Sequence, residues 1–343
     1  MPPERPDLNQ LAPEVRAYIE YLEEQLASRG AAQRSRSAAP VEPSEPPTTM
    51  QVITITGGGV AKRTPRHLYG RQRRGGMGVF DLDVEENDPP AFLVIADESD
   101  DLILFTDRSR YFRVPVRDLP ETEARGAGSS LLTNLSLQPG ENLAVVAPAS
   151  GGSILYLLST RGWVRRIGAS QLAPIKPGTM LEVRQGHIPA AACWGNGGAT
   201  LVIASESGKG IRFAERQVPV QGGCLGIRLD PSETARFITV VDDEGGVFLL
   251  SDEGKGTIRL MSGLRANKSP GAGGKVLMKA ERLVGAQAVT EQDDIFAISR
   301  LSKIIRFRAD EIPAKEGVVQ GVNCMSLRAD EVVACAVTTV PAP

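Results

Sequence analysis

A basic, glycine-rich segment between residues 62 and 78 holds the side chains best suited to chemistry with phosphate. Six cations occur within thirteen residues that contain no acid, namely Lys62, Arg63, Arg66, Arg71, Arg73 and Arg74. The last two belong to the run Gln72-Arg73-Arg74-Gly75-Gly76-Met77-Gly78. Guanidinium groups are planar donors that match phosphate oxygens, and glycines let a backbone approach a ligand and expose its N–H groups. We expect this segment to hold a DNA backbone without reading bases, although charge alone would favour a solvated protein face.

The scarcity of other reactive residues excludes several kinds of site. The two histidines, His67 and His187, cannot build a multi-histidine metal centre, and each is expected to be a surface or turn residue. The four cysteines form no Cys-x-x-Cys pair, which argues against a zinc ribbon and favours reduced, buried thiols. No P-loop sequence for ATP occurs. We therefore expect a protein that is not an enzyme and that uses no metal or cofactor.

A repeat positions the basic segment. Each unit starts with an apolar strand that ends in Ser or Thr, continues through a tight turn, and leads to a second strand that carries an arginine. The arginines recur at steps of 50, 53, 46, 47 and 47 residues, and they are Arg63, Arg113, Arg166, Arg212, Arg259 and Arg306. A glycine-containing turn and a further apolar strand follow, which gives roughly four strands per unit, joined by hairpins.

Six such units fill residues 51–340. Four-stranded repeats of roughly 40 to 50 residues are typical of propeller blades, and closing the ring removes exposed sheet edges. A sandwich of many strands is the alternative, but it gives no reason for six near-equal periods. The sequence therefore predicts an all-β, six-bladed propeller over residues 50–340.

Two further segments precede the predicted propeller. In residues 1–30, apolar residues recur at helical spacing over residues 7–29, which predicts one amphipathic N-terminal helix. Residues 31–49 are rich in Ala, Ser, Pro and charge, and we expect them to form a flexible linker. The helix could dock on its own domain, or it could serve self-association or partner docking as a short coiled coil.

The run from Gln72 to Gly78 resembles the gyrase box, the signature of the C-terminal domain of DNA gyrase A. The residues from Tyr69 onward and the sixfold repeat support this resemblance, which covers residues 51–340. The resemblance implies a six-bladed β-pinwheel that binds double-stranded DNA around its rim and bends it, an action that in gyrase leads to negative supercoiling. The family usually has a basic residue where this chain has Met77.

The resemblance also implies which residues contact DNA. The box residues carry over as Gln72, Arg73, Arg74, Gly75, Gly76 and Gly78. The neighbouring cations are further candidates, namely Lys62, Arg63, Arg66 and Arg71. A wrap needs cations on several successive blades, because counterion release must offset the energy of bending the duplex. The repeated arginines are therefore secondary candidates, namely Arg113, Arg166, Arg212, Arg259 and Arg306.

Composition refines the expected function. The chain has 39 Lys+Arg and 41 Asp+Glu in 343 residues, so any DNA surface must be a local basic patch. About 50 residues precede the predicted pinwheel, which are too few for the breakage-reunion module of gyrase. We expect a free-standing, non-catalytic DNA-binding and bending module that affects DNA topology alone or with gyrase or topoisomerase IV subunits.

The sequence also bears on location and on an alternative function. Neither a signal peptide nor a membrane span occurs, which predicts a cytoplasmic, nucleoid-associated protein. The alternative function is a β-propeller scaffold that docks to a partner protein through the N-terminal helix. Met77 and the near-neutral charge balance favour this alternative.

Overall fold

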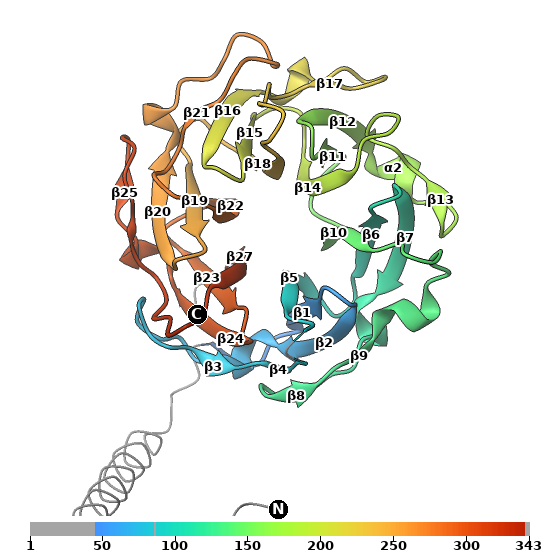
Figure 1. The fold of residues 1–343 in the computed structure, drawn as a ribbon, viewed down its shortest axis with the longest axis vertical. Coiled ribbons are helices and arrows are strands. Elements are labelled where there is room, and N and C mark those ends of the chain that lie inside the picture. Colours follow the sequence, from blue (N-terminus) through green and yellow to red (C-terminus); the bar gives the residue numbers. More distant parts are fainter. Residues whose placement is uncertain (1–44, 86, 340–343) are drawn as a thin grey trace, which may run out of the picture. The chain divides into compact units, whose positions relative to one another are not determined.

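The computed structural model describes residues 45–85 and 87–339 of the chain. The predicted N-terminal helix and its predicted self-association lie outside the described residues, as does most of the predicted linker. Within the described residues, no helix is long and apolar enough to cross a membrane. The strands of this part run from Met50 to Thr339 and form a ring of six sheets, which we call blades 1 to 6 (Figure 1).

Each blade has one strand at the centre of the ring and another at the rim (Figure 1). From centre to rim, blade 1 consists of β5 (Pro90–Asp97), β1 (Met50–Thr56), β2 (Val60–Pro65) and β9 (Ser129–Ser130). Blade 2 consists of β10 (Leu143–Pro148), β6 (Asp101–Thr106), β7 (Arg110–Pro115) and β13 (Thr179–Met180). Blade 3 consists of β14 (Pro189–Gly195), β11 (Ile154–Ser159), β12 (Trp163–Gly168) and β17 (Cys224–Leu225). Blade 4 consists of β18 (Ala235–Val241), β15 (Thr200–Ser205), β16 (Lys209–Ala214) and β21 (Lys275–Val276). Blade 5 consists of β22 (Leu283–Val289), β19 (Gly246–Ser251) and β20 (Lys255–Leu260), and both β25 (Ala314–Lys315) and β26 (Val322–Asn323) pair with β20 at the rim. Blade 6 consists of β27 (Val332–Thr339), β23 (Asp293–Ser299), β24 (Lys303–Arg308) and β3 (Val79–Phe80).

A few short elements connect these strands. Outside the blades, β4 (Leu82–Asp83) pairs with β8 (Gly126–Ala127) in parallel. One helical turn follows the second hairpin strand of each repeat, and these turns are η2 (Arg66–Leu68), η3 (Val116–Asp118), α2 (Ala169–Leu172), η5 (Glu215–Gln217), η6 (Met261–Gly263) and η7 (Ala309–Glu311). A further turn, η4 (Leu131–Asn134), follows β9.

The hairpin that opens each repeat explains why Ser or Thr recurs at the end of its first strand. In all six hairpins the hydroxyl oxygen accepts a hydrogen bond from the backbone N–H four residues later, at 2.9 to 3.3 Å. The residue before that N–H has a positive φ in every hairpin, and it is glycine in four of them. The hydroxyl therefore stabilises the tight turn at Thr56, Thr106, Ser159, Ser205, Ser251 and Ser299.

The rim strand of each blade is supplied by the next repeat along the chain. Strand β9 lies in the second repeat but pairs with β2 of blade 1, and the same offset holds in blades 2 to 5. The first repeat supplies β3 to blade 6, where Val79 pairs with Ile304 and Phe80 pairs with Lys303. This last crossing closes the ring between blades 6 and 1 (Figure 1).

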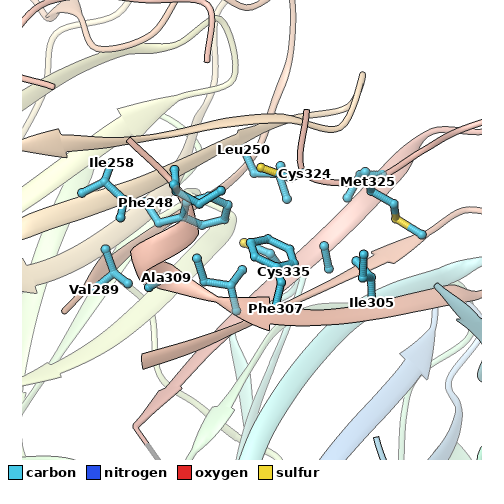
Figure 2. Close-up of a cluster of buried hydrophobic side chains, with 14 of the residues drawn as sticks. Phe248, Leu250, Ile258, Val289, Ile305, Phe307, Ala309, Cys324, Met325 and Cys335 are labelled. Atoms are coloured by element: carbon cyan, nitrogen blue, oxygen red, sulfur yellow. The ribbon is translucent and has the colours of Figure 1, made fainter. Parts of the chain in front are cut away.

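The hydrophobic core lies between neighbouring blades. Figure 2 shows the cluster between blades 5 and 6, where Phe248 and Leu250 of β19 lie near Ile305 and Phe307 of β24. Comparable clusters fill the other five junctions, including the one between blades 6 and 1. The first hairpin strands are buried along nearly their whole length because both of their faces are covered. The predicted six-bladed β-propeller is confirmed.

The end of the predicted flexible linker is packed against blade 1. Glu45 is buried, and the backbone N–H of Thr48 donates to Nδ1 of His67 at 3.3 Å. The carbonyl of Thr49 accepts from the backbone N–H of Glu98 at 3.0 Å. The linker prediction is therefore wrong for residues 45–49. Their polar composition is typical of a solvated linker, but the carboxylate of Glu45 is buried.

Candidate nucleic-acid interface

The segment Gln72 to Gly78, which we call the box, bridges blades 1 and 6. The backbone N–H of Gln72 donates to the carbonyl of Arg306 at 2.7 Å, and that of Gly75 donates to the carbonyl of Cys324 at 2.7 Å. The carbonyl of Gly76 accepts from Ser326 at 2.9 Å. The box thus runs along the last blade before its chain enters β3, and it is part of the seam that closes the ring.

The two arginines of the box lie in different environments. Arg74 is half-buried, and its Nε donates to the carbonyl of Glu311 at 2.9 Å, while its Nη1 donates to the carbonyl of Asn323 at 3.2 Å. Its backbone N–H donates to Oε2 of Glu311 at 3.0 Å. Arg73 is exposed, and its side chain makes no hydrogen bond or ion pair with the described residues. Arg74 therefore holds the box against η7 of blade 6 and β26 of blade 5, and Arg73 is available to a ligand.

The glycines of the box serve the backbone. The N–H groups of Gly75 and Gly76 bond to the carbonyls of Cys324 and Arg73, so the predicted exposure of these two groups to a ligand is wrong. A Cβ atom at Gly78 would lie 2.6 Å from the carbonyl oxygen of Ile304, and φ there is +72°. Glycine also occupies the residue before the rim strand in every other repeat, at Gly128, Gly178, Gly223, Gly274 and Gly321.

This recurrence assigns Gly78 a structural task. The chain passes closely against the preceding blade at this point. A Cβ atom added to Gly128 would lie 2.8 Å from the carbonyl oxygen of Ala61, and one added to Gly321 would lie 2.5 Å from the carbonyl oxygen of Gly256. Gly78 is therefore needed for the crossing between blades, as its counterparts are.

Lys62 is a predicted DNA contact that the structure corrects. Its side chain is fully buried, and its Nζ lies 2.7 Å from Oδ1 of Asp81. Asp81 also accepts hydrogen bonds from Thr54 and from the hydroxyl of Tyr69. Desolvation lowers the pKa of Lys62, although Asp81 opposes this, and burial raises the pKa of Tyr69 well above its ordinary value. Lys62 neutralises a buried carboxylate, so it cannot reach a phosphate.

Arg66 and Arg306 are corrected in the same way. Both are buried in the seam, where Nη2 of Arg66 lies 2.8 Å and Nη1 of Arg306 lies 3.1 Å from the carboxylate of Glu45. Arg306 also pairs with Asp294 at 2.6 Å, and Asp294 pairs in turn with Arg71 at 2.9 Å. Burial tends to raise the pKa of Glu45, but the hydrogen bonds and charges of the two arginines outweigh it and hold this pKa below its ordinary value. We call these five residues the seam network.

The other repeated arginines divide into two groups. Arg212 is buried and donates to the carbonyls of Met261 and Leu264, so it ties blade 4 to blade 5. Arg259 is also buried, and it pairs with Val247, one register position away from its counterparts in blades 2, 3, 4 and 6. The prediction that these two contact DNA is corrected, because neither reaches the surface.

Three of the predicted cations remain at or near the surface. Arg113 is exposed and pairs with Asp101 at 2.5 Å, and Arg166 is half-buried. Arg63 is mostly covered and pairs with Glu121. Together with Arg73 and with Arg71, whose side chain is 30% exposed, these residues stay candidates for a direct DNA contact.

The structure brings further cations to the rim that the sequence interpretation missed. The first residue of the second hairpin strand pairs with the rim strand, and it is a cation in four blades, at Arg110, Lys209, Lys255 and Lys303. The sequence signal is a Lys or Arg four residues after the Ser or Thr that ends the first strand. Arg110, Lys209 and Lys255 pair with acids, whereas Lys303 has no ion pair within the described part of the chain.

Comparisons with known proteins agree with this geometry. The profile of a family described as "DNA gyrase C-terminal domain, beta-propeller" matches residues 51–88, 100–150, 199–242 and 293–339. The DNA gyrase A protein of Mycobacterium tuberculosis is 27% identical over 293 residues, and that of Chlamydia pneumoniae is 28% identical over 296 residues. These alignments cover 80% and 81% of this chain but 35% of each relative, so the chain spans about a third of their length.

Two solved structures share the fold. A DNA gyrase A C-terminal domain superposes with a TM-score of 0.74 at 19% identity, covering 84% of this chain and 99% of that one. The C-terminal domain of a DNA topoisomerase IV gives a TM-score of 0.59 at 16% identity, covering 85% of this chain and 94% of the other. Both likenesses show the propeller architecture.

Proposed function

The chain belongs to the family of DNA gyrase C-terminal domains, and from this premise we propose that its propeller binds double-stranded DNA along its rim and bends it. The observation that carries the proposal is the exposed Arg73 in the box, which the seam holds at the junction of blades 6 and 1. Phosphate contacts of this kind release counterions and give affinity without sequence preference.

We assign no chemical step to the described residues. The ionisable cluster of Lys62, Tyr69 and Asp81 is buried. No group of His, Cys, Asp or Glu in the described part of the chain is arranged to hold a metal ion. The proposed action is mechanical, as a change in the path of DNA.

Partners and location belong to the same proposal. Double-stranded DNA is the proposed ligand, and a gyrase or topoisomerase IV subunit is the proposed protein partner where the module does not act alone. A nucleoid-associated, cytoplasmic location would follow from DNA binding. The alternative scaffold function depends on residues 7–29, which lie outside the described residues, and it stays a prediction.

A salt-titrated binding measurement tests the DNA proposal. We expect R73A to weaken binding to a labelled duplex and to reduce the slope of log K against log salt by about one. The matched control is R236A, because Arg236 is exposed on β18 and lines the central channel. Equal affinities and slopes for R73A and the unchanged protein would contradict the proposal, as would an absence of binding at low salt.

A further inference from the structure

An exposed aromatic ring lies on the rim strand that follows the box. Phe80 of β3 is 48% exposed, and Met77 and Val79 beside it are 49% and 40% exposed. Phe80 lines a surface hollow of about 440 Å³ together with Leu301, which is 47% exposed. Phe80 and Leu301 line the same hollow, and apolar side chains exposed together in this way are typical of an interaction surface.

Cations flank this ring. The Nζ of Lys303 lies 5.6 Å and the Cζ of Arg125 lies 5.8 Å from the centroid of Phe80. Arg125 is exposed and, like Lys303, makes no ion pair with the described residues. The hollow also holds Asp83 and Glu85, so we assign phosphate contacts to the two cations beside the ring and not to the interior of the hollow.

Blades 2 and 4 place an exposed apolar residue at the same register but neutralise its cation. Met180 pairs with Arg110 across the strands, and Glu141 lies 2.7 Å from Arg110. Val276 pairs with Lys209, and Glu233 lies 3.2 Å from that lysine.

Blade 6 differs at the residue two positions before its inner strand. Asp330 takes the place that Glu141 and Glu233 hold in their blades, but its Oδ1 accepts from the backbone N–H groups of Leu301 and Glu331, at 3.1 and 2.9 Å. Lys303 is therefore left with its charge uncompensated beside an aromatic ring.

We propose that Phe80, with Lys303 and Arg125, is a DNA-bending contact in which the ring enters a base step from the minor groove. Apolar side chains that enter a base step partly unstack it and kink the duplex, while cations beside them hold the flanking phosphates. The occupant is DNA because the charges flanking the ring match phosphates and because Phe80 follows Gly78 of the box by two residues. This inference rests on the proposed DNA-binding function and adds the point at which the duplex is bent.

The experiment uses the full chain and a duplex that carries 2-aminopurine and a pair of end-attached fluorophores. Binding of the unchanged protein should raise the 2-aminopurine emission, which reports unstacking, and should shorten the end-to-end distance. F80A should abolish both signals and weaken binding about tenfold, in the range expected for lost stacking on an aromatic ring. It should leave the salt slope unchanged, because no cation is removed.

V276A is the matched control, since it removes an exposed apolar side chain at the same register of blade 4, and it should behave as the unchanged protein. If F80A does not fold, Phe80→Asn replaces it, because Asn323 occupies this register in blade 5. Unchanged unstacking and bending in a folded Phe80 variant would overturn the inference. If R73A weakens binding while a folded Phe80 variant binds, unstacks and bends the duplex as the unchanged protein does, this inference alone fails; if nothing binds, the proposed function fails.

Discussion

At the scale of single residues, two adjacent arginines of the box perform different tasks. The sequence predicts both as DNA contacts because their residue type and spacing are the same. Their difference comes from Glu311 and Asn323, which lie 237 and 249 residues from Arg74 along the chain. A local pattern cannot reveal partners at that distance, so the box could be located from the sequence while the division of work within it could not.

Replacing each arginine separately should expose this division. R74A removes the two hydrogen bonds that the side chain donates to the carbonyls of Glu311 and Asn323, and it should lower the free energy of unfolding by about 1 to 3 kcal/mol. R73A removes an exposed side chain and should change it by less than about 0.5 kcal/mol. Chemical denaturation measures both values, and equal stability of the two variants would refute the assignment.

Gly78 offers a second test at this scale. G78A should cost about 1 to 3 kcal/mol, because a side chain is strained at a φ of +72° and the new Cβ would lie 2.6 Å from the carbonyl oxygen of Ile304. G198A is the control, since Gly198 has no positive φ and no atom within 4 Å of the position of its Cβ. A melting temperature for G78A that matches the unchanged protein would show that the glycine is not needed for the crossing.

At the scale of elements, the sequence predicts the hairpins and a strand after each glycine-containing turn, but it does not predict that this strand joins the preceding blade. The strand that ends in Ser or Thr recurs with its turn because each hydroxyl bonds the turn directly. A rim strand such as β3 has two residues and pairs with a different repeat, so its own repeat does not reveal its partner. For the same reason the sequence could not separate the buried Arg212 from the exposed Arg113, since both pair across their hairpins at the same register.

The hairpin of blade 3 should make stability depend on pH. Its Ser159 hydroxyl lies 3.1 Å from Nδ1 of His187, whereas Thr56, Thr106 and Ser205 bond to carboxylates. Burial, followed by the charges of Arg184 and Arg161, lowers the pKa of His187 from its ordinary 6.5.

Because the unfolded chain binds this proton more readily, the stabilising contribution is complete above about pH 6.5 and is lost as the pH falls toward the lowered pKa of the folded state. H187Q should flatten this part of a profile of melting temperature against pH. A profile with the same slope in H187Q and the unchanged protein would rule out His187 as its source.

At the scale of the whole molecule, the ring is closed by residues from both ends of the described chain. Strand β3 pairs with β24, and Glu45 joins Arg66 of blade 1 to Arg306 of blade 6. The sixfold repeat was sufficient to predict a closed ring. The seam network was not predictable, because charged residues are expected at the surface and composition does not show which of them are buried.

Removing Glu45 should weaken the closed ring. E45A leaves the buried guanidinium of Arg66 without its carboxylate partner and leaves Arg306 with Asp294 alone, and breaking a buried pair in this way costs about 3 to 5 kcal/mol. E253A is the control, since the pair between Glu253 and Lys255 is exposed at 3.6 Å and should contribute about 0 to 1 kcal/mol. Equal unfolding midpoints for the two variants would show that Glu45 does not stabilise the seam.

The central claim is that the propeller changes the path of DNA along its rim, and a linking-number measurement tests it most directly. Relaxed circular DNA is incubated at low salt with the full chain and a nicking-closing enzyme, and its topoisomers are then resolved. We predict a shift in the mean linking number that grows with protein concentration, is reduced by R73A and F80A, and is retained by R236A. A distribution that stays unchanged at every protein concentration would contradict the account.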